Sequence, residues 1–247
     1  MLTIWKGLLD LIFPRRPECP FCGAASPKGE PCSGCLTILG SYHRERPCTR
    51  CGRLAEKGAA LMHNGAGHLC YDCRKRDWPF TLARAGGAYE GVIKETVHRF
   101  KYAGRRSLAV HLATLMVDVC RLEPCYQTAG LIVPVPLSRE KLRLRGFNQA
   151  ELLAVEVGRA LGMPVNGNCL VKDFDTPPQA GLNRVARESN LKGAFSVKRP
   201  EVIRDQVVLI IDDVFTTGST MSAAAAALRR AGARQVMGLT AATGRYI

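Results

Sequence analysis

The chain has 247 residues, of which 47% are hydrophobic and 23% charged, which are ordinary values for a globular protein. No apolar run is long enough to cross a bilayer, and residues 1–14 lack the basic leader and cleavage site of a signal peptide, so we expect a cytoplasmic protein. The net charge of +14 favours anionic ligands, such as a sugar polyphosphate or nucleic acid, but a solvated basic surface would give the same excess.

The first segment, residues 1–14, is expected to form an amphipathic helix. Trp5, Leu8, Leu9 and Ile12 fall on one face at helical spacing. We expect this face to pack against the rest of the protein rather than to lie on a membrane.

Residues 15–78 are predicted to form a double zinc ribbon. Eight of the eleven cysteines stand here in four C-x-x-C pairs, and two such pairs supply the four thiolates of a tetrahedral zinc site. Paired cysteines without a secretory signal favour zinc in a reducing compartment over disulfides. Sequential pairing gives one site from Cys19, Cys22, Cys32 and Cys35 and a second from Cys48, Cys51, Cys70 and Cys73. A cross-braced pairing of the same residues is the alternative.

Little apolar sequence accompanies these cysteines, so the metal would supply most of the free energy that folds the segment. His63 and His68 are expected to be bystanders, because eight cysteines already satisfy two zinc ions. The basic residues between 44 and 76 suit a nucleic-acid contact and a solvated surface about equally well.

Residues 79–247 are predicted to form one further domain, in which strands and helices alternate. Such alternation indicates an α/β fold, with a parallel sheet and helices on both faces. The expected strands are 83–89, 131–136, 169–172, 194–197, 207–211 and 235–241. The expected helices are 92–100, 108–120, 148–161 and 220–231, with Asn148 as an N-cap.

Two basic segments of this domain suit a pyrophosphate group. A loop that carries Lys141, Arg143 and Arg145 follows the strand end at Pro136, and the alternative is a solvated basic loop without a ligand. The long polar segment 173–193 is typical of a lid, whose Arg184 and Arg187 would close over the polyphosphate and exclude water.

The most informative stretch is residues 207–220. Five apolar residues, Val207 to Ile211, predict a strand buried on both faces, and Asp212 and Asp213 follow at its carboxyl end. Helix amino termini bind phosphate, and carboxylates accept hydrogen bonds from sugar hydroxyls or hold Mg²⁺, so the stretch predicts a ribose 5-phosphate site. The phosphate would lie on Thr216, Thr217, Gly218, Ser219 and Thr220.

Two other interpretations of this stretch are weaker. Solvated aspartates beside a capped helix would not need an unbroken Thr-Thr-Gly-Ser-Thr sequence. The acidic motif of a P-loop NTPase requires a G-x-x-x-x-G-K-[ST] segment elsewhere. Gly86 and Gly91 have that spacing, but Val92 and Ile93 follow them.

The ordered strand, acid pair, loop and helix resemble the 5-phosphoribosyl-1-pyrophosphate (PRPP) motif of the type I phosphoribosyltransferases. Nearly the whole chain resembles the ComF/GntX family, described as phosphoribosyltransferase-like proteins with an amino-terminal zinc module. The segments that carry the resemblance are the cysteine pairs, 100–102, 134–138, 145–149, 176–179, Arg187, Asn190, 193–195 and 207–220.

The resemblance implies a phosphoribosyltransferase that uses PRPP with Mg²⁺ and carries two structural zinc ions. Asp212 and Asp213 would then be the catalytic acids, and the acceptor stays open. Purine-type relatives carry an aspartate where Thr216 stands, so purine salvage is in doubt. Some family members are linked to DNA uptake, so the alternative is a non-catalytic adaptor that handles single-stranded DNA, or meets DNA-uptake proteins, and keeps a PRPP pocket.

Overall fold

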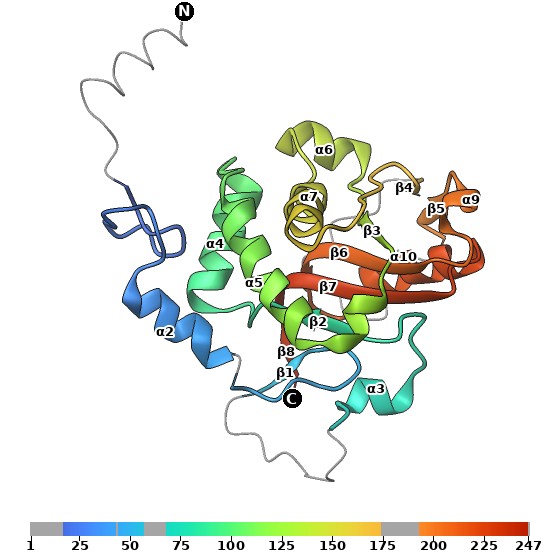
Figure 1. The fold of residues 1–247 in the computed structure, drawn as a ribbon, viewed down its shortest axis with the longest axis horizontal. Helices are drawn as coiled ribbons and strands as arrows, with labels where there is room; N and C mark the ends of the chain where they lie inside the picture. Colours follow the sequence, from blue (N-terminus) through green and yellow to red (C-terminus); the bar gives the residue numbers. More distant parts are fainter. Residues whose placement is uncertain (1–16, 43, 57–67, 174–192, 247) are drawn as a thin grey trace, which may run out of the picture.

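The computed structural model describes residues 17–42, 44–56, 68–173 and 193–246. The predicted helix over residues 1–14, His63 and the predicted lid arginines, Arg184 and Arg187, lie outside these ranges. The described part has the expected α/β fold (Figure 1). No helix in the described ranges has the length and hydropathy that a membrane span needs.

A four-stranded parallel sheet forms the centre of the fold, and the strand order is β2-β7-β6-β3. The strands are β2 (Ala83–Ala85), β3 (Leu131–Pro134), β6 (Val207–Phe215) and β7 (Gln235–Thr243). Val208 on β6 lies opposite Leu131 on β3 and Val236 on β7, so β6 has a hydrogen-bonded neighbour on each side. All four strands were expected from the sequence, and β6 runs four residues beyond the predicted apolar run.

Helices cover both faces of this sheet, as predicted. Leu209 and Ile211 of β6 belong to a hydrophobic cluster that includes residues of three helices of this domain, whereas Val208 and Ile210 belong to a second cluster that includes residues of a fourth, on the other face. The first three are α4 (Gly91–Tyr102), α5 (Leu108–Leu122) and α7 (Gln149–Leu161), and the last is α10 (Ser219–Arg230). Side chains alternate between the faces of a strand, so the apolar first part of β6, residues 207–211, supplies both clusters.

Smaller elements complete the domain. Strands β4 and β5 pair antiparallel, apart from the central sheet. These elements are η1 (Pro124–Thr128), α6 (Arg139–Arg145), β4 (Leu170–Lys172), β5 (Phe195–Val197) and α9 (Pro200–Ile203).

The basic segment after β3 is a helix, α6, where the sequence analysis expected a loop. Both ends of this helix are capped in ordinary ways. The Ser138 hydroxyl accepts a hydrogen bond from the Lys141 N–H, and Gly146 ends the helix with a φ of 72°. These caps allow a helix that buries none of its own residues.

The cysteine module contains helix α2 (Ser33–Tyr42), strand β1 (Leu54–Ala55) and helix α3 (Tyr71–Lys75). Strand β1 pairs in parallel with β8 (Arg245–Tyr246), the last described strand (Figure 1). Phe21 and Leu39 join the hydrophobic cluster beneath α4 and α5, whereas Trp78 and Phe80 join the opposite cluster. The module therefore contributes to both faces of the fold, and the boundary at residue 78 stays a prediction.

Polar contacts tie the module to the sheet domain, and two arginines of that domain make several of them. The Arg99 guanidinium on α4 donates to the carbonyl oxygens of Pro20 at 2.7 Å and Phe21 at 2.5 Å. Near the carboxyl terminus, the Arg245 guanidinium forms ion pairs with Glu45 at 2.6 Å and Glu90 at 2.9 Å. Arg245 is thus shared between β8, the module and the start of α4.

We predict that Gly52→Ala destabilises the protein by roughly 2–4 kcal/mol, measured by urea unfolding. Gly52 has a φ of 70°, and an added methyl group would overlap the Ala83 carbonyl and lie 2.9 Å from the Cα of Arg84 on β2. Gly40→Ala is the matched control. Gly40 lies inside α2 with open space around it, so alanine there should be neutral or stabilising by about 0.5–1 kcal/mol. Equal effects of the two substitutions would contradict the prediction.

Candidate functional site

The carboxyl end of β6 carries the two predicted acids. The strand is fully buried from Val207 to Ile211, and its exposure increases at Asp212, Asp213 and Val214. It then continues to Phe215, which is buried again, so the acids lie within the strand rather than after it. This places both carboxylates at the edge of the sheet where α/β folds bind ligands.

A tight bend connects β6 to helix α10. Gly218 occupies the N-cap position with a φ of 78°, in the left-handed region that suits glycine. The Thr217 and Ser219 hydroxyls lie 2.8 Å apart, and the Ser219 N–H donates to Thr217 Oγ1 at 3.4 Å. The 12-residue α10 therefore begins at a bend lined by hydroxyls, and a helix amino terminus of this kind is a favourable place for an anion.

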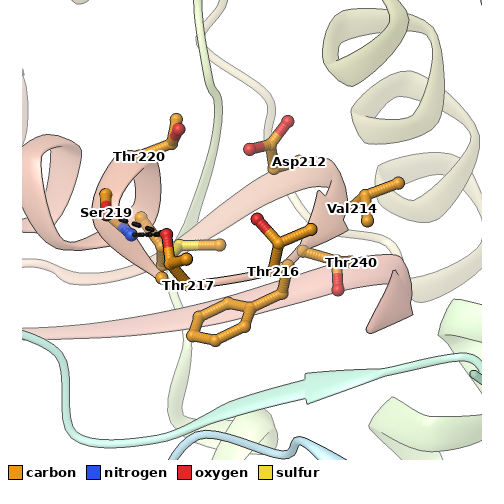
Figure 2. A pocket seen from close by; sticks show the side chains of 10 residues that line it. Asp212, Val214, Thr216, Thr217, Ser219, Thr220 and Thr240 are labelled. Atoms are coloured by element: carbon orange, nitrogen blue, oxygen red, sulfur yellow. Dashed lines mark hydrogen bonds between the residues drawn. The ribbon is translucent and has the colours of Figure 1, made fainter. Parts of the chain in front are cut away.

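A small hollow of about 50 Å³ lies inside this bend. Figure 2 shows Thr220 from the helix and Asp212 from the strand on one side of it, and Thr216 below Asp212, near Thr240. The structure therefore brings together all five residues of the predicted phosphate loop. The lining residues are Asp212, Val214, Phe215, Thr216, Thr217, Gly218, Ser219, Thr220, Met221 and Thr240.

A larger hollow of about 420 Å³ adjoins the first, and its volume is in the range of small-molecule sites. The two share Asp212, Val214, Thr216 and Thr220. Lysine and arginine side chains and three aromatic rings form much of its remaining wall. The further lining residues are Tyr89, Lys101, Tyr102, Val135, Pro136, Leu137, Ser138, Lys141, Arg145, Lys172, Phe195 and Asp213.

The acid pair is held by a lysine from a distant helix. Lys101 Nζ, at the end of α4, lies 2.8 Å from Asp213 Oδ1, and both side chains are about 15% exposed or less. Burial alone would lower the pKa of Lys101, but the charges of Asp213 and Asp212 outweigh it and raise that pKa. Lys101 therefore keeps its charge and compensates the carboxylate that it contacts.

Asp212 differs from its neighbour. Burial, and next the charge of Asp213, raise the pKa of Asp212 from 3.8 to about 7. The Asp213 N–H donates to Asp212 Oδ1 at 2.8 Å, which favours the charged form but does not offset the other effects. Asp212 is thus poised to gain or lose a proton near neutral pH.

The predicted pyrophosphate residues are only partly brought to this cavity. Within α6, Lys141 and Arg145 line it and Arg143 does not. The Arg145 guanidinium donates to Gln149 Oε1 at 2.9 Å and lies 5.1 Å from the centre of the Tyr102 ring. Arg184 and Arg187 lie outside the described residues.

Several residues that line the cavity were not predicted as site residues from the sequence. Lys101 had a usable signal, because it stands four residues after the inward-facing Val97 on an amphipathic helix. Lys172 and Phe195 lie on β4 and β5, where Lys172 Nζ is 5.9 Å from the ring centre of Phe195. The antiparallel pairing of β4 with β5 brings both to the site. Phe195 lies in a segment that carries the family resemblance, whereas Lys172 had no signal in the sequence.

The eight cysteines form two tetrads with the sequential pairing, and the sulfur atoms within each lie within 4.8 Å of one another. The cross-braced alternative is wrong. The tetrads are Cys19, Cys22, Cys32 and Cys35, and Cys48, Cys51, Cys70 and Cys73. Four sulfurs at this spacing are the donor set of structural zinc. His68 contacts the Tyr246 hydroxyl and belongs to neither tetrad, as expected of a bystander.

Hydrogen-bond donors surround the second tetrad. The Arg53 guanidinium donates to Cys70 Sγ at 3.3 Å and to Asp72, the Cys70 N–H donates to Cys48 Sγ at 3.3 Å, and the Trp78 indole donates to Cys73 Sγ at 3.2 Å. Such donors stabilise thiolates and fix their orientation, so this tetrad fits a bound zinc ion.

Two family models match the chain. A double zinc ribbon domain matches residues 8–76, and a phosphoribosyl transferase domain matches residues 149–244. The first covers both tetrads, and the second covers α7, the acid pair, the bend and α10.

Curated relatives match most of the chain. "Competence protein F" of Haemophilus influenzae is 32% identical over 83% of this chain and 86% of its own length. "DNA utilization protein YhgH" of Escherichia coli K12 is 32% identical over 68% of this chain and 75% of its own. "Competence protein ComFC" of Bacillus subtilis is 29% identical over 75% of this chain and 72% of its own.

We predict that Asp212→Asn stabilises the protein at pH 8 but not at pH 4. A carboxyl whose pKa is raised on folding contributes stability that is complete below its unfolded pKa and is lost as the pH rises through about 7. Asparagine removes the buried charge, so the gain at pH 8 should be about 2–4 kcal/mol in urea unfolding. Asp118→Asn, on an exposed part of α5, is the control and should change little at either pH. A gain at pH 4 as large as at pH 8 would refute the assignment.

Proposed function

Since this chain belongs to the ComF/GntX family, we propose that it binds PRPP and transfers its 5-phosphoribosyl group to an acceptor, releasing pyrophosphate. The observation that carries the proposal is the hydroxyl-lined bend at the amino terminus of α10, directly beside two acids at the carboxyl end of β6. The match to the phosphoribosyl transferase model over residues 149–244 supports it.

The 5-phosphate would lie in the small hollow. The backbone N–H groups of the first turn of α10 and the hydroxyls of Thr216, Thr217, Ser219 and Thr220 would donate to its oxygens. Gly218 lets the backbone bend there without a side chain in the way. An anion is favoured at this end of the helix by the helix dipole as well.

The ribose and pyrophosphate would occupy the larger hollow. Asp212 and Asp213 would accept hydrogen bonds from the ribose hydroxyls, with Lys101 paired to the Asp213 carboxylate. Lys141 and Arg145 would meet the pyrophosphate from α6. Arg143, and Arg184 and Arg187 of the predicted lid, are proposed to add charge once the ligand is bound.

The reaction itself is a displacement at C1 of the ribose. The bond from C1 to the pyrophosphate oxygen breaks, pyrophosphate leaves with the bonding electrons, and the acceptor forms a new bond to C1. The carboxylates would stabilise the positive charge that develops on the ribose. Asp212 and Asp213 offer oxygen ligands that suit Mg²⁺, which would neutralise pyrophosphate charge when bound with PRPP.

The acceptor is left open by these residues. Thr216 stands where purine-type enzymes carry an aspartate, so this position offers no carboxylate to take a proton from a purine. The zinc-ribbon module, with two structural Zn²⁺ ions, is proposed as a scaffold for the sugar-phosphate domain, in a reducing, cytoplasmic setting.

A second candidate function is the handling of single-stranded DNA without catalysis. The names of the relatives, which refer to competence and DNA utilization, and the net charge of +14 favour it. In that case the pocket would serve as a sensor of PRPP or persist without turnover, and DNA-uptake proteins would be further partners.

We predict that the protein binds PRPP in the presence of Mg²⁺ in isothermal titration calorimetry. Turnover should be sought across a panel of nucleobases and amines, with pyrophosphate release as the signal. Asp213→Asn should abolish turnover, because asparagine lacks the charge that Lys101 holds in place. The Asp118→Asn variant is the control and should retain wild-type binding. A wild-type protein that binds no PRPP would rule out this function.

The DNA function makes a separate prediction. Single-stranded oligonucleotides should bind in fluorescence anisotropy, with an affinity that falls steeply between 50 and 200 mM salt, because phosphate contacts release counterions. Asp213→Asn should leave this binding nearly intact. DNA binding without turnover of PRPP on any acceptor would favour the adaptor, whereas turnover without DNA binding would exclude it.

A further inference from the structure

We propose that Trp78 is a positioning residue, which connects the second cysteine tetrad to the glycine of the phosphate loop and so couples zinc binding to sugar-phosphate binding. The inference rests on the proposed PRPP site and adds a way to regulate it. Trp78 is the residue at which the predicted module meets the sheet domain, and its side chain is 6% exposed.

On one side, the Trp78 ring supports the bend between β6 and α10. A methyl group added to Gly218 would lie 2.9 Å from Cζ3 and 3.0 Å from Cη2 of Trp78, and 2.6 Å from Cζ of Phe215. The Gly218 backbone is therefore packed directly on two aromatic rings. Because protein interiors are close-packed, a displaced ring would shift the loop with it.

On the other side, the indole ring contacts the metal-binding sulfurs. Trp78 Nε1 donates a hydrogen bond to Cys73 Sγ at 3.2 Å, and Cys73 is itself buried. An indole N–H can only donate a hydrogen bond, and when it is buried it needs an acceptor such as this sulfur. A zinc ion that holds Cys73 as a thiolate would fix this acceptor in place, as a contact beyond the metal's own ligands.

Between these two contacts the ring has little freedom. It stacks on Phe80 with ring centres 5.0 Å apart and planes at 28°, and the Arg76 guanidinium lies 4.8 Å from its centre. The Trp78 carbonyl accepts a hydrogen bond from the Arg50 guanidinium at 3.3 Å. Because the ring is held in this way, a shift of Cys73 would move the ring against Gly218, and a shift of Gly218 would move it against Cys73.

The consequence is a reciprocal coupling. If zinc in the second tetrad stabilises the ring position that the loop needs, ribose 5-phosphate must stabilise zinc by the same factor. Within the described residues the first tetrad has no such link, because its knuckle packs against α4 on the opposite face of the sheet, through Phe21 and Arg99.

The test uses the zinc-loaded full chain and Trp78→Phe, which keeps an aromatic ring but removes the N–H donor. We expect ribose 5-phosphate to bind about fivefold or more weakly to this variant in calorimetry. Saturating ribose 5-phosphate should also slow zinc release to a colorimetric chelator from the wild type, and should have little effect on the variant. Tyr126→Phe is the matched control, since it removes the hydrogen bond from a buried hydroxyl to the Gly238 carbonyl. It should lower the free energy of unfolding, but leave unchanged both the affinity for ribose 5-phosphate and the effect of ribose 5-phosphate on zinc release.

Gly218→Ala tests the same contact from the other end, in case Trp78→Phe does not fold. Its added methyl group would push on the ring, so zinc should be released faster although the substitution lies in the phosphate loop. Unchanged ribose 5-phosphate binding in Trp78→Phe, or zinc release that ribose 5-phosphate does not alter in the wild type, would overturn the inference while the PRPP site stands. A wild type that binds no ribose 5-phosphate would overturn both.

Discussion

Strand β6 has hydrogen-bonded neighbours on both sides and apolar clusters on both faces, and this constraint decides where the chemistry can lie. Polar groups inside such a strand would be buried without partners, so they are confined to its end. There the strand meets a helix that starts with free N–H groups. The rigid sheet thus fixes the positions of the two acids relative to the hydroxyl-lined bend between β6 and α10.

Placing two carboxylates at this edge has an electrostatic consequence. Two carboxylates in one partly buried site repel each other, so one of them must be paired with a positive charge or take up a proton. Here both solutions occur: Lys101 compensates Asp213, and the pKa of Asp212 rises to about 7. The arrangement is costly for stability without a ligand, as functional sites often are, and a cationic ligand or a diol would relieve it.

The central motif, the parallel sheet and the sequential cysteine tetrads could be predicted, because each depends on residues close together in sequence. A buried apolar run with acids at its end predicts a central strand with a site at its carboxyl end, and the fold has this arrangement. Helix α6 was mistaken for a loop although Ser138 and Gly146 carried ordinary cap signals, because its charged residues resembled a solvated segment. The helical spacing of Lys101 indicated that it faces inward, but not that Asp213 is its partner, because that ion pair joins residues more than a hundred positions apart. The role of Trp78 could not be predicted from the sequence for the same reason, since its contact with Gly218 is equally remote along the chain. Strand β1 is too short for any periodicity to show.

The pairing of β1 with β8 has a consequence for how the protein is made. Leu54 and Ala55 belong to the early cysteine module, yet their partners, Arg245 and Tyr246, are synthesised after all the other described strands. While the ribosome is still translating the domain, this side of the module has neither its strand partner nor the ion pairs of Arg245 with Glu45 and Glu90. The nascent module must therefore persist with β1 unpaired until translation reaches β8. Unpaired strand edges are sites at which incompletely synthesised chains aggregate. Early capture of metal by the tetrads would protect it during that interval.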